Sequence, residues 1–212
     1  MAPMSNVSSS SEELQRMYEA RFFGRIEYRD RVWLVLLRDY FQRFIRSEDT
    51  VLDLGAGYGE FINNVQCGKK YAMDLNSDTT QKVHADVEVL SQDCAASWKL
   101  EDESLDVVFT SNFFEHLPDK FALTRTLREA RRCLKPGGRL IAMGPNIKYV
   151  PGAYWDFWDH HIPLTELSLA EVLSQNGFSI EKNIDKFLPF TMASGPHYPL
   201  FFVSVYLRLP LA

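Results

Sequence analysis

The residues best suited to hold a small molecule lie in residues 51–61, where an apolar run leads into a turn with glycine at every second position. Gly55, Gly57 and Gly59 have no Cβ atom, so the backbone can adopt positive φ angles and approach a ligand closely. A helix is expected after Tyr58, and the unpaired N–H groups of its first turn would also face the ligand. The segment therefore predicts a turn that binds a small molecule.

An acid placed just before the glycines narrows the choice of ligand. A dinucleotide-binding turn has the spacing G-x-G-x-x-G and holds a pyrophosphate. Here the spacing is acid-x-G-x-G-x-G, and the carboxylate of Asp53 would repel a pyrophosphate but attract an ammonium group. We therefore expect a ligand that carries a positive charge near the turn.

Length and composition indicate an ordinary globular protein. Of the 212 residues, 46% are hydrophobic and 24% are charged, close to globular averages. The formal net charge of −5 argues against binding to nucleic acid or to an anionic membrane through bulk electrostatics. Cys67, Cys94 and Cys133 form no C-x-x-C pair, which predicts neither disulfides nor a thiolate zinc site and favours a reducing compartment.

The sequence divides into three parts. Residues 1–11 are rich in serine and lack the pattern of a signal peptide, which predicts a disordered leader in a cytoplasmic protein. Residues 12–48 have helical character, and their apolar stripe predicts a helical cap packed on a sheet at its ligand-binding edge. Residues 49–212 form the expected binding core, in which residues 145–166 are the candidate substrate loop. No apolar run is long enough to span a bilayer stably.

Strands and helices alternate through this core. The expected strands are residues 50–54, 71–74, 87–90, 105–111, 139–143 and 178–184, and the expected helices follow Thr79 and cover 120–134 and 167–176. Pro136, Gly137 and Gly138 predict a turn between a helix and the fifth strand. Such alternation predicts an α/β fold with a doubly wound, mostly parallel, Rossmann-like sheet, whose strands end at one ligand-binding edge.

Four phrases of this sequence resemble those of small, bacterial-type class I S-adenosylmethionine-dependent methyltransferases. They read L-D-L-G-A-G-Y-G-E-F, S-N-F-F-E-H-L, L-K-P-G-G and Y-W-D-F-W-D-H-H. The first three are widespread and bear on fold and cofactor, whereas the last is narrower. The resemblance spans about residues 28–209 and implies S-adenosylmethionine as the cofactor.

The resemblance also implies roles for particular residues. Asp74 closes the second strand, where an acid reaches ribose hydroxyls in Rossmann-like sheets. Asp93 is expected to accept a hydrogen bond from the adenine amino group. Ser111 and Asn112 would lie below the methionine part of the cofactor, and Phe113 would flank it. The full set of expected cofactor contacts is Asp53, Gly55, Ala56, Gly57, Tyr58, Gly59, Asp74, Leu75, Asp93, Cys94, Ser111, Asn112 and Phe113.

A dense group of aromatic, acidic and imidazole side chains follows the fifth strand. A loop at this end of a strand belongs to the active edge of the sheet, which predicts recognition of the substrate. In an alternative interpretation, the tryptophans only pack beneath the helix that begins at Leu167. The expected substrate contacts are Asn146, Tyr154, Trp155, Asp156, Trp158 and His160.

Three histidines are candidate catalytic bases, because a hydroxyl acceptor must lose its proton as the new bond forms. They are His116, His160 and His161. His116 has an alternative role in orienting the backbone, and Glu115 beside it is expected to be structural. Because the adjacent His160 and His161 would point apart in an extended backbone, no metal site is predicted.

The leading interpretation is a methyltransferase that acts on an oxygen or nitrogen atom of a small molecule, with no nucleic-acid partner. Two alternatives remain open at this point: an inactive partner subunit that binds S-adenosylmethionine, and another enzyme with the same pocket, such as an aminopropyl transferase. The apolar run at residues 200–207 is either the last, antiparallel strand of the family fold or a helix, and the pattern slightly favours the helix. The acceptor and the oligomeric state stay undetermined.

Overall fold

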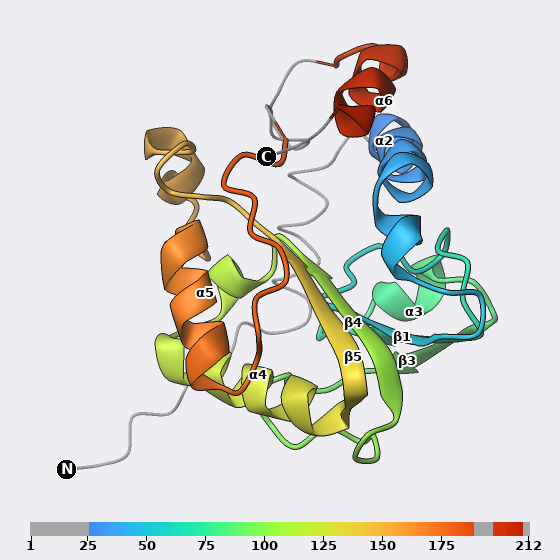
Figure 1. The fold of residues 1–212 in the computed structure, drawn as a ribbon, viewed down its shortest axis with the longest axis vertical. Coiled ribbons are helices and arrows are strands. Elements are labelled where there is room, and N and C mark those ends of the chain that lie inside the picture. The colour runs from blue at the N-terminus through green and yellow to red at the C-terminus, as the bar shows by residue number, and fades with distance from the viewer. Residues whose placement is uncertain (1–25, 189–196, 210–212) are drawn as a thin grey trace.

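A computed structural model describes residues 26–188 and 197–209, and its centre is a five-stranded parallel sheet (Figure 1). The expected leader, residues 1–11, and the first part of the helical cap, residues 12–25, lie outside the described residues. The strand order is β3-β2-β1-β4-β5. The strands are β1 (Thr50–Leu54), β2 (Lys69–Met73), β3 (Val87–Leu90), β4 (Leu105–Ser111) and β5 (Leu134–Met143). The parallel α/β fold is therefore confirmed.

Helices cover both faces of the sheet, so β1 and β4 are buried along nearly their whole length. On one face, α2 (Ile26–Asp39) and the 3-10 turn η1 (Phe41–Phe44) pack on the sheet. A cluster of rings holds this layer together, and Phe61 stacks on Phe109 with ring centroids 3.6 Å apart. The described part of residues 12–48 is therefore largely helical and packs on this face of the sheet.

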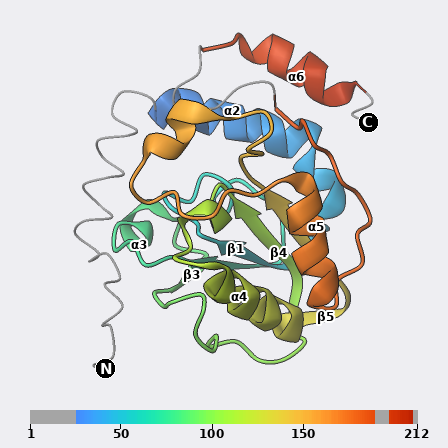
Figure 2. The same ribbon diagram turned by 90° about the vertical axis from the view of Figure 1, so that its left-hand side faces the viewer.

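On the other face lie α4 (Lys120–Cys133) and α5 (Glu166–Gln175) (Figure 2). The short helix α3 (Thr79–Lys82) follows β2, and Val83 at its end packs against the first core. The Asp119 side chain caps α4 by accepting a hydrogen bond from the Ala122 N–H group, at 2.7 Å. Thr165 and Ser168 form a reciprocal capping box at the start of α5. Such caps satisfy N–H groups that the helix itself leaves unpaired.

The apolar run near the end of the chain forms the helix α6 (Leu200–Arg208), which confirms the favoured alternative. Figure 2 shows that α6 lies along the outer side of α2. The Arg208 guanidinium reaches the Asp39 carboxylate at 2.9 Å, and Val203 and Leu207 are buried against the first core layer. None of the helices within the described ranges is long and apolar enough to cross a membrane.

Three expectations about local structure were wrong. Residues 60–64 after the glycine turn form turns instead of a regular helix. The Asn64 side chain donates to the Glu60 carbonyl, and Asn63 bonds to the backbone of Lys82 and His84; asparagine side chains compete in this way with the hydrogen bonds of a helix.

The segment at residues 136–138 is not a turn before the fifth strand but an irregular part of β5 itself, opposite a register shift in β4. Residues 178–184 do not form a strand. Phe178 packs in the core beneath α4 and α5, whereas Ile184 packs in the core beneath α2. Within the described residues this segment is not paired with β5 as a strand, although Glu181 forms an ion pair with Arg139 of β5 at 3.5 Å.

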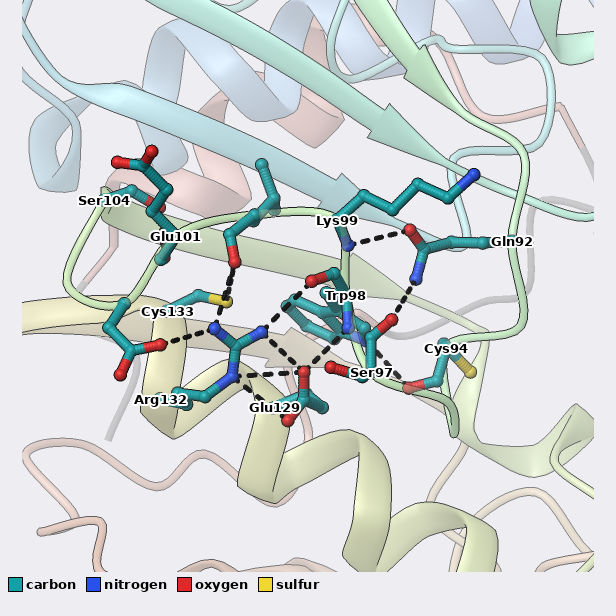
Figure 3. A network of polar contacts seen from close by, with 12 residues as sticks. Gln92, Cys94, Ser97, Trp98, Lys99, Glu101, Ser104, Glu129, Arg132 and Cys133 are labelled. Carbon is teal, nitrogen blue, oxygen red and sulfur yellow. Dashed lines mark hydrogen bonds and ion pairs between the residues drawn. The ribbon is translucent and has the colours of Figure 1, made fainter.

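Arg132 on α4 joins the helix to the connection between β3 and β4 (Figure 3). Its guanidinium contacts Glu129 at 2.6 Å and the carbonyl oxygen of Trp98 at 3.2 Å. The Glu129 carboxylate also accepts from the Trp98 backbone N–H group at 2.7 Å. The hydrogen bond from Arg132 holds the pKa of Glu129 below its usual range.

We expect Glu129→Gln to lower the free energy of unfolding by about 1 kcal/mol at pH 7, because a charge-assisted contact to Arg132 is lost. A carboxyl group with a lowered folded-state pKa stabilises the fold above its unfolded pKa of about 4.3, and this contribution disappears as the pH falls through the folded-state pKa. Urea unfolding at pH 7 and in acid measures both effects. Glu101→Gln, on the same connection but exposed, is the matched control and should change little.

Candidate functional site

A cavity of about 1400 Å³ extends from the carboxyl ends of β1 and β4 along β5 to residues 134–139 at the start of that strand. One part of its wall is the glycine turn after β1, and another is the end of β4 with the 3-10 turn η2 (Phe114–His116). The loop after β5, residues 177–188, β5 itself and parts of α2, η1 and α5 form the rest of the wall. The parallel register brings these segments together, because Leu54 pairs with Met73 and Thr110, and Ser111 pairs with Met143.

The glycine turn has the backbone conformation that its sequence predicts. Gly55, Gly57 and Gly59 have φ angles of +74°, +54° and +77°. The Gly57 N–H group donates to the Asp74 carboxylate at 2.7 Å, and the Gly57 carbonyl accepts from the Thr79 hydroxyl at 2.8 Å. The end of β2 and the start of α3 therefore hold the turn in place.

Gly55 allows an unusually close approach of an aromatic ring. A Cβ atom on Gly55 would lie 2.3 Å from the Phe113 ring, so no larger residue fits without movement. Phe113 is adjacent to Asn112, which has a positive φ of +48°, a conformation that asparagine tolerates better than most residues. The end of β4 is thus shaped to bring Phe113 over the turn.

Several buried acids lie at this end of the cavity, where burial disfavours their charged forms. Burial raises the pKa of Asp53 well above its usual range, and the neighbouring carboxylates of Glu60 and Asp74 raise it further. Burial also raises the pKa of Asp74, opposed by the backbone N–H groups that donate to it. Glu60 is paired with the Arg29 guanidinium at 2.7 Å. Two of these acids, Asp53 and Glu60, line the cavity, where they favour a bound cation.

The predicted cofactor contacts are only partly brought to the cavity wall. Asp74 does not line the cavity. One oxygen of its carboxylate accepts from the Gly57 N–H group, and the other accepts from the Asn76 N–H group at 2.8 Å. Asp93 is exposed and accepts from the Ala95 N–H group at 2.8 Å, and Cys94 is buried in the second core. The predicted residues that line the cavity are Asp53, Gly55, Ala56, Gly57, Ser111 and Asn112; those that do not are Tyr58, Gly59, Asp74, Leu75, Asp93, Cys94 and Phe113.

The loop at residues 145–166 is held at both ends. Asn146 and Leu164 form an isolated parallel bridge, in which the Ile147 N–H group donates to the Leu164 carbonyl at 3.0 Å. The Asn146 side chain donates to Glu166 at 2.7 Å, and Lys148 forms an ion pair with the same carboxylate. The loop therefore leaves and returns to the sheet at a fixed position.

Glu115 anchors the middle of this loop to the end of β4. Its carboxylate accepts from the Tyr154 hydroxyl at 2.9 Å, and its carbonyl oxygen accepts from the N–H groups of His161 and Ile162 at 2.7 and 3.2 Å. Burial raises the pKa of Glu115, against the opposing influence of His116. The expectation that Glu115 is structural agrees with these contacts.

Two histidines and an acid meet beside this anchor. The His116 Nδ1 atom lies 2.9 Å from the Asp159 carboxylate, and the His116 and His160 rings are 4.7 Å apart. His160 is oriented by a contact of 2.6 Å between its Nδ1 atom and the Tyr154 carbonyl oxygen. His116 and His160 line the cavity, whereas His161 is exposed and does not.

Only some of the expected substrate contacts line the cavity. Asn146, Tyr154 and His160 line the cavity. Trp155 instead donates its indole N–H group to the Val150 carbonyl at 2.7 Å, Asp156 is exposed, and Trp158 is 91% exposed. None of these three residues lines the cavity. The tryptophans do not pack beneath α5 as the alternative interpretation proposed, since neither belongs to that core.

The sequence did not single out Asp159 as a site residue, and it did not assign Glu115 a place in the cavity wall. Asp159 lies in the phrase D-H-H, so its type was a usable signal, but its pairing with His116 joins positions 43 residues apart. Tyr149 and Phe157 also line the cavity. Aromatic residues at every few positions gave no indication of which would face inward.

Comparison with known proteins identifies the family to which this architecture corresponds. A model of the methyltransferase domain matches residues 25–183, which include all five strands and α4 and α5. No curated protein matches the chain.

Solved structures give the same fold at low sequence identity. The complex of the Trm112 methyltransferase activator with a candidate methyltransferase from Haloferax volcanii has a TM-score of 0.67 at 20% identity, covering 85% of this chain and 82% of that one. A Thermotoga maritima S-adenosylmethionine-dependent methyltransferase, described as a possible histamine N-methyltransferase, has a TM-score of 0.61 at 21% identity. The match covers 80% of this chain and 79% of that one. An S-adenosylmethionine-dependent methyltransferase of Archaeoglobus fulgidus has a TM-score of 0.62 at 19% identity, and the match covers 93% of each chain.

We expect Gly55→Ala to lower the free energy of unfolding by about 3 kcal/mol, since it combines an unfavourable positive φ with a clash against Phe113. Gly137→Ala is the matched control, because Gly137 has a φ of +79° but nothing within 4 Å of an added Cβ. That variant should lose only about 1 kcal/mol. Urea unfolding of both variants measures the difference, and equal losses would mean that Phe113 does not constrain the turn.

Proposed function

Because this chain belongs to the class I S-adenosylmethionine-dependent methyltransferases, we propose that it methylates an oxygen or nitrogen atom of a small molecule. The observation that carries this proposal is the continuity of the cavity from the glycine turn to Tyr154 and His160. Its volume of about 1400 Å³ exceeds the roughly 300–1,000 Å³ of a typical single-ligand pocket. The cavity also extends along β5 and residues 177–188, and we assign its part between the glycine turn and His160 to the cofactor and the acceptor.

The residues at the glycine end fit S-adenosylmethionine. The positive φ angles of the turn expose backbone atoms that a flat nucleoside can meet. Asp53 is buried among other acids at the cavity wall, where a cationic ligand would relieve its unfavourable charge. We assign Asp53 to the ammonium group of the methionine part.

Asp74 is assigned to the ribose, although its side chain contacts the glycine turn and does not line the cavity. A carboxylate has about four acceptor positions; the N–H groups of Gly57 and Asn76 occupy two of them, and the Leu75 N–H group also interacts with the carboxylate. The remaining positions can accept ribose hydroxyls once the ligand meets the turn. Ser111 and Asn112 line the cavity next to this region and are assigned to the methionine part.

The cofactor supplies an activated methyl group, so the protein needs chiefly to align the acceptor atom with that methyl. We propose that the acceptor lies against the side chains of Tyr154 and His160, with its nucleophile near His116. Glu115 keeps this wall in position through Tyr154. A hydroxyl acceptor loses its proton beside the group formed by His116, Asp159 and His160, whereas an uncharged amine needs no base before it attacks.

Calorimetric titration separates the roles of the two acids. S-adenosylhomocysteine carries the ammonium group and the ribose, whereas methylthioadenosine carries only the ribose. Asp53→Asn should weaken S-adenosylhomocysteine binding by at least tenfold and leave methylthioadenosine unchanged, because one charge pair is removed. Asp74→Asn should weaken both ligands. If Asp53→Asn weakened both equally, its assignment to the ammonium group would be wrong.

Methyl transfer to the acceptor is tested with radiolabelled S-adenosylmethionine and a panel of small hydroxyl and amine compounds. We expect at least one compound to be labelled, and His116→Ala and His160→Ala to lower kcat with a hydroxyl acceptor by about 100-fold. S-adenosylhomocysteine binding should be unchanged in both variants. His84→Ala, an exposed histidine outside the cavity, should keep full activity. Labelling of proteins or RNA alone would contradict the proposed acceptor class.

A further inference from the structure

The group formed by His116, Asp159 and His160 has a geometry that its sequence positions do not indicate. One potential ligand atom from each residue lies within 4.8 Å of the other two, and all three side chains are partly buried. His116 comes from η2, and the other two come from the loop after β5. The prediction of no metal considered His160 with His161, whereas the fold provides His116 as the second imidazole.

The orientation of His160 is a second and independent sign of a ligand. Its Nδ1 atom lies 2.6 Å from the Tyr154 carbonyl oxygen, which can only accept a hydrogen bond. The ring proton is therefore assigned to Nδ1, and Nε2 carries the lone pair. Histidines that bind metal ions usually donate their other N–H group in this way, to a backbone carbonyl or a carboxylate.

The surrounding contacts fix both halves of the group. Glu115 precedes His116 and holds the loop through Tyr154 and the His161 N–H group. Two ligands of one zinc ion, each about 2 Å from it, lie at most about 4 Å apart. The three ligand atoms lie within 4.8 Å of one another, so no separation needs to shrink by more than about 1 Å to reach this distance.

We propose that His116, Asp159 and His160 bind one divalent transition-metal ion of the zinc and cobalt type. Two imidazoles and one carboxylate suit such ions better than magnesium or calcium, which prefer oxygen ligands. Three protein ligands are also the usual set of a catalytic zinc site, which keeps a further position open. His116 and His160 line the cavity beside the space assigned to the acceptor.

The role of this ion rests on the proposed function. A cation at this place lowers the pKa of an acceptor hydroxyl. The O–H bond then breaks and its proton passes to water, while the new O–C bond forms as the S–C bond of the donor breaks. S-adenosylhomocysteine leaves with the electron pair of that bond. The sulfonium charge is lost as the proton is released, so charge and atoms balance.

Metal binding itself is tested without activity. The full chain is dialysed against EDTA and titrated with CoCl₂, followed by visible absorption, and with ZnCl₂, followed by calorimetry. We expect one ion per chain and a visible cobalt band. His116→Ala, Asp159→Ala and His160→Ala should each weaken zinc binding by at least tenfold, and circular dichroism checks that each variant is folded.

His161→Ala is the matched control, because His161 is adjacent to His160 but lies outside the group. It should bind zinc as the unmodified chain does. The proposal is overturned if the unmodified chain binds no stoichiometric ion, or if His160→Ala and His161→Ala bind equally well. Stoichiometric zinc binding without any labelled small acceptor would leave this site standing and would count against the proposed function alone.

Discussion

The parallel register of β1, β2, β4 and β5 is the constraint on which the candidate site depends. Strands that run in one direction end at one edge, so the glycine turn, Asp74, the end of β4 and the loop after β5 all begin within the same region. No single segment could form the cavity. The two cores beneath α2 and beneath α4 and α5 hold the sheet from both faces and keep that edge open.

Within that edge, a buried carboxylate at Glu115 ties the two halves of the cavity together. A buried acid is unfavourable unless it is hydrogen-bonded, and Tyr154 provides the bond. The same residue accepts two loop N–H groups through its carbonyl. The aromatic loop is thus positioned by polar contacts, which explains how it can present His160 inward while Trp158 stays in solvent.

Local sequence patterns predicted the regular strands and helices, but they did not predict the irregular segments. The limits of β1, β3 and β4 match those expected, because short apolar runs between turn signals leave little choice. The strand expected at residues 178–184 failed although its pattern alternates, since its two ends pack in different cores. The segment after Tyr58 forms turns with only isolated helix-type hydrogen bonds, and the side chains of Asn63 and Asn64 bond to backbone groups there. Packing and side-chain competition both override propensity.

The sequence by itself determined the glycine turn, the acid before it and the parallel α/β order. Glycine residues allow close backbone approach, and hydrophobic periodicity indicates strands and helices, so both features depend on residues that are near one another in the sequence. Only the tertiary structure decided which members of the aromatic loop face the cavity and that His116 meets Asp159 and His160. These residues are distant along the chain, and no local spacing encodes a contact that arises when two loops are brought to the same sheet edge.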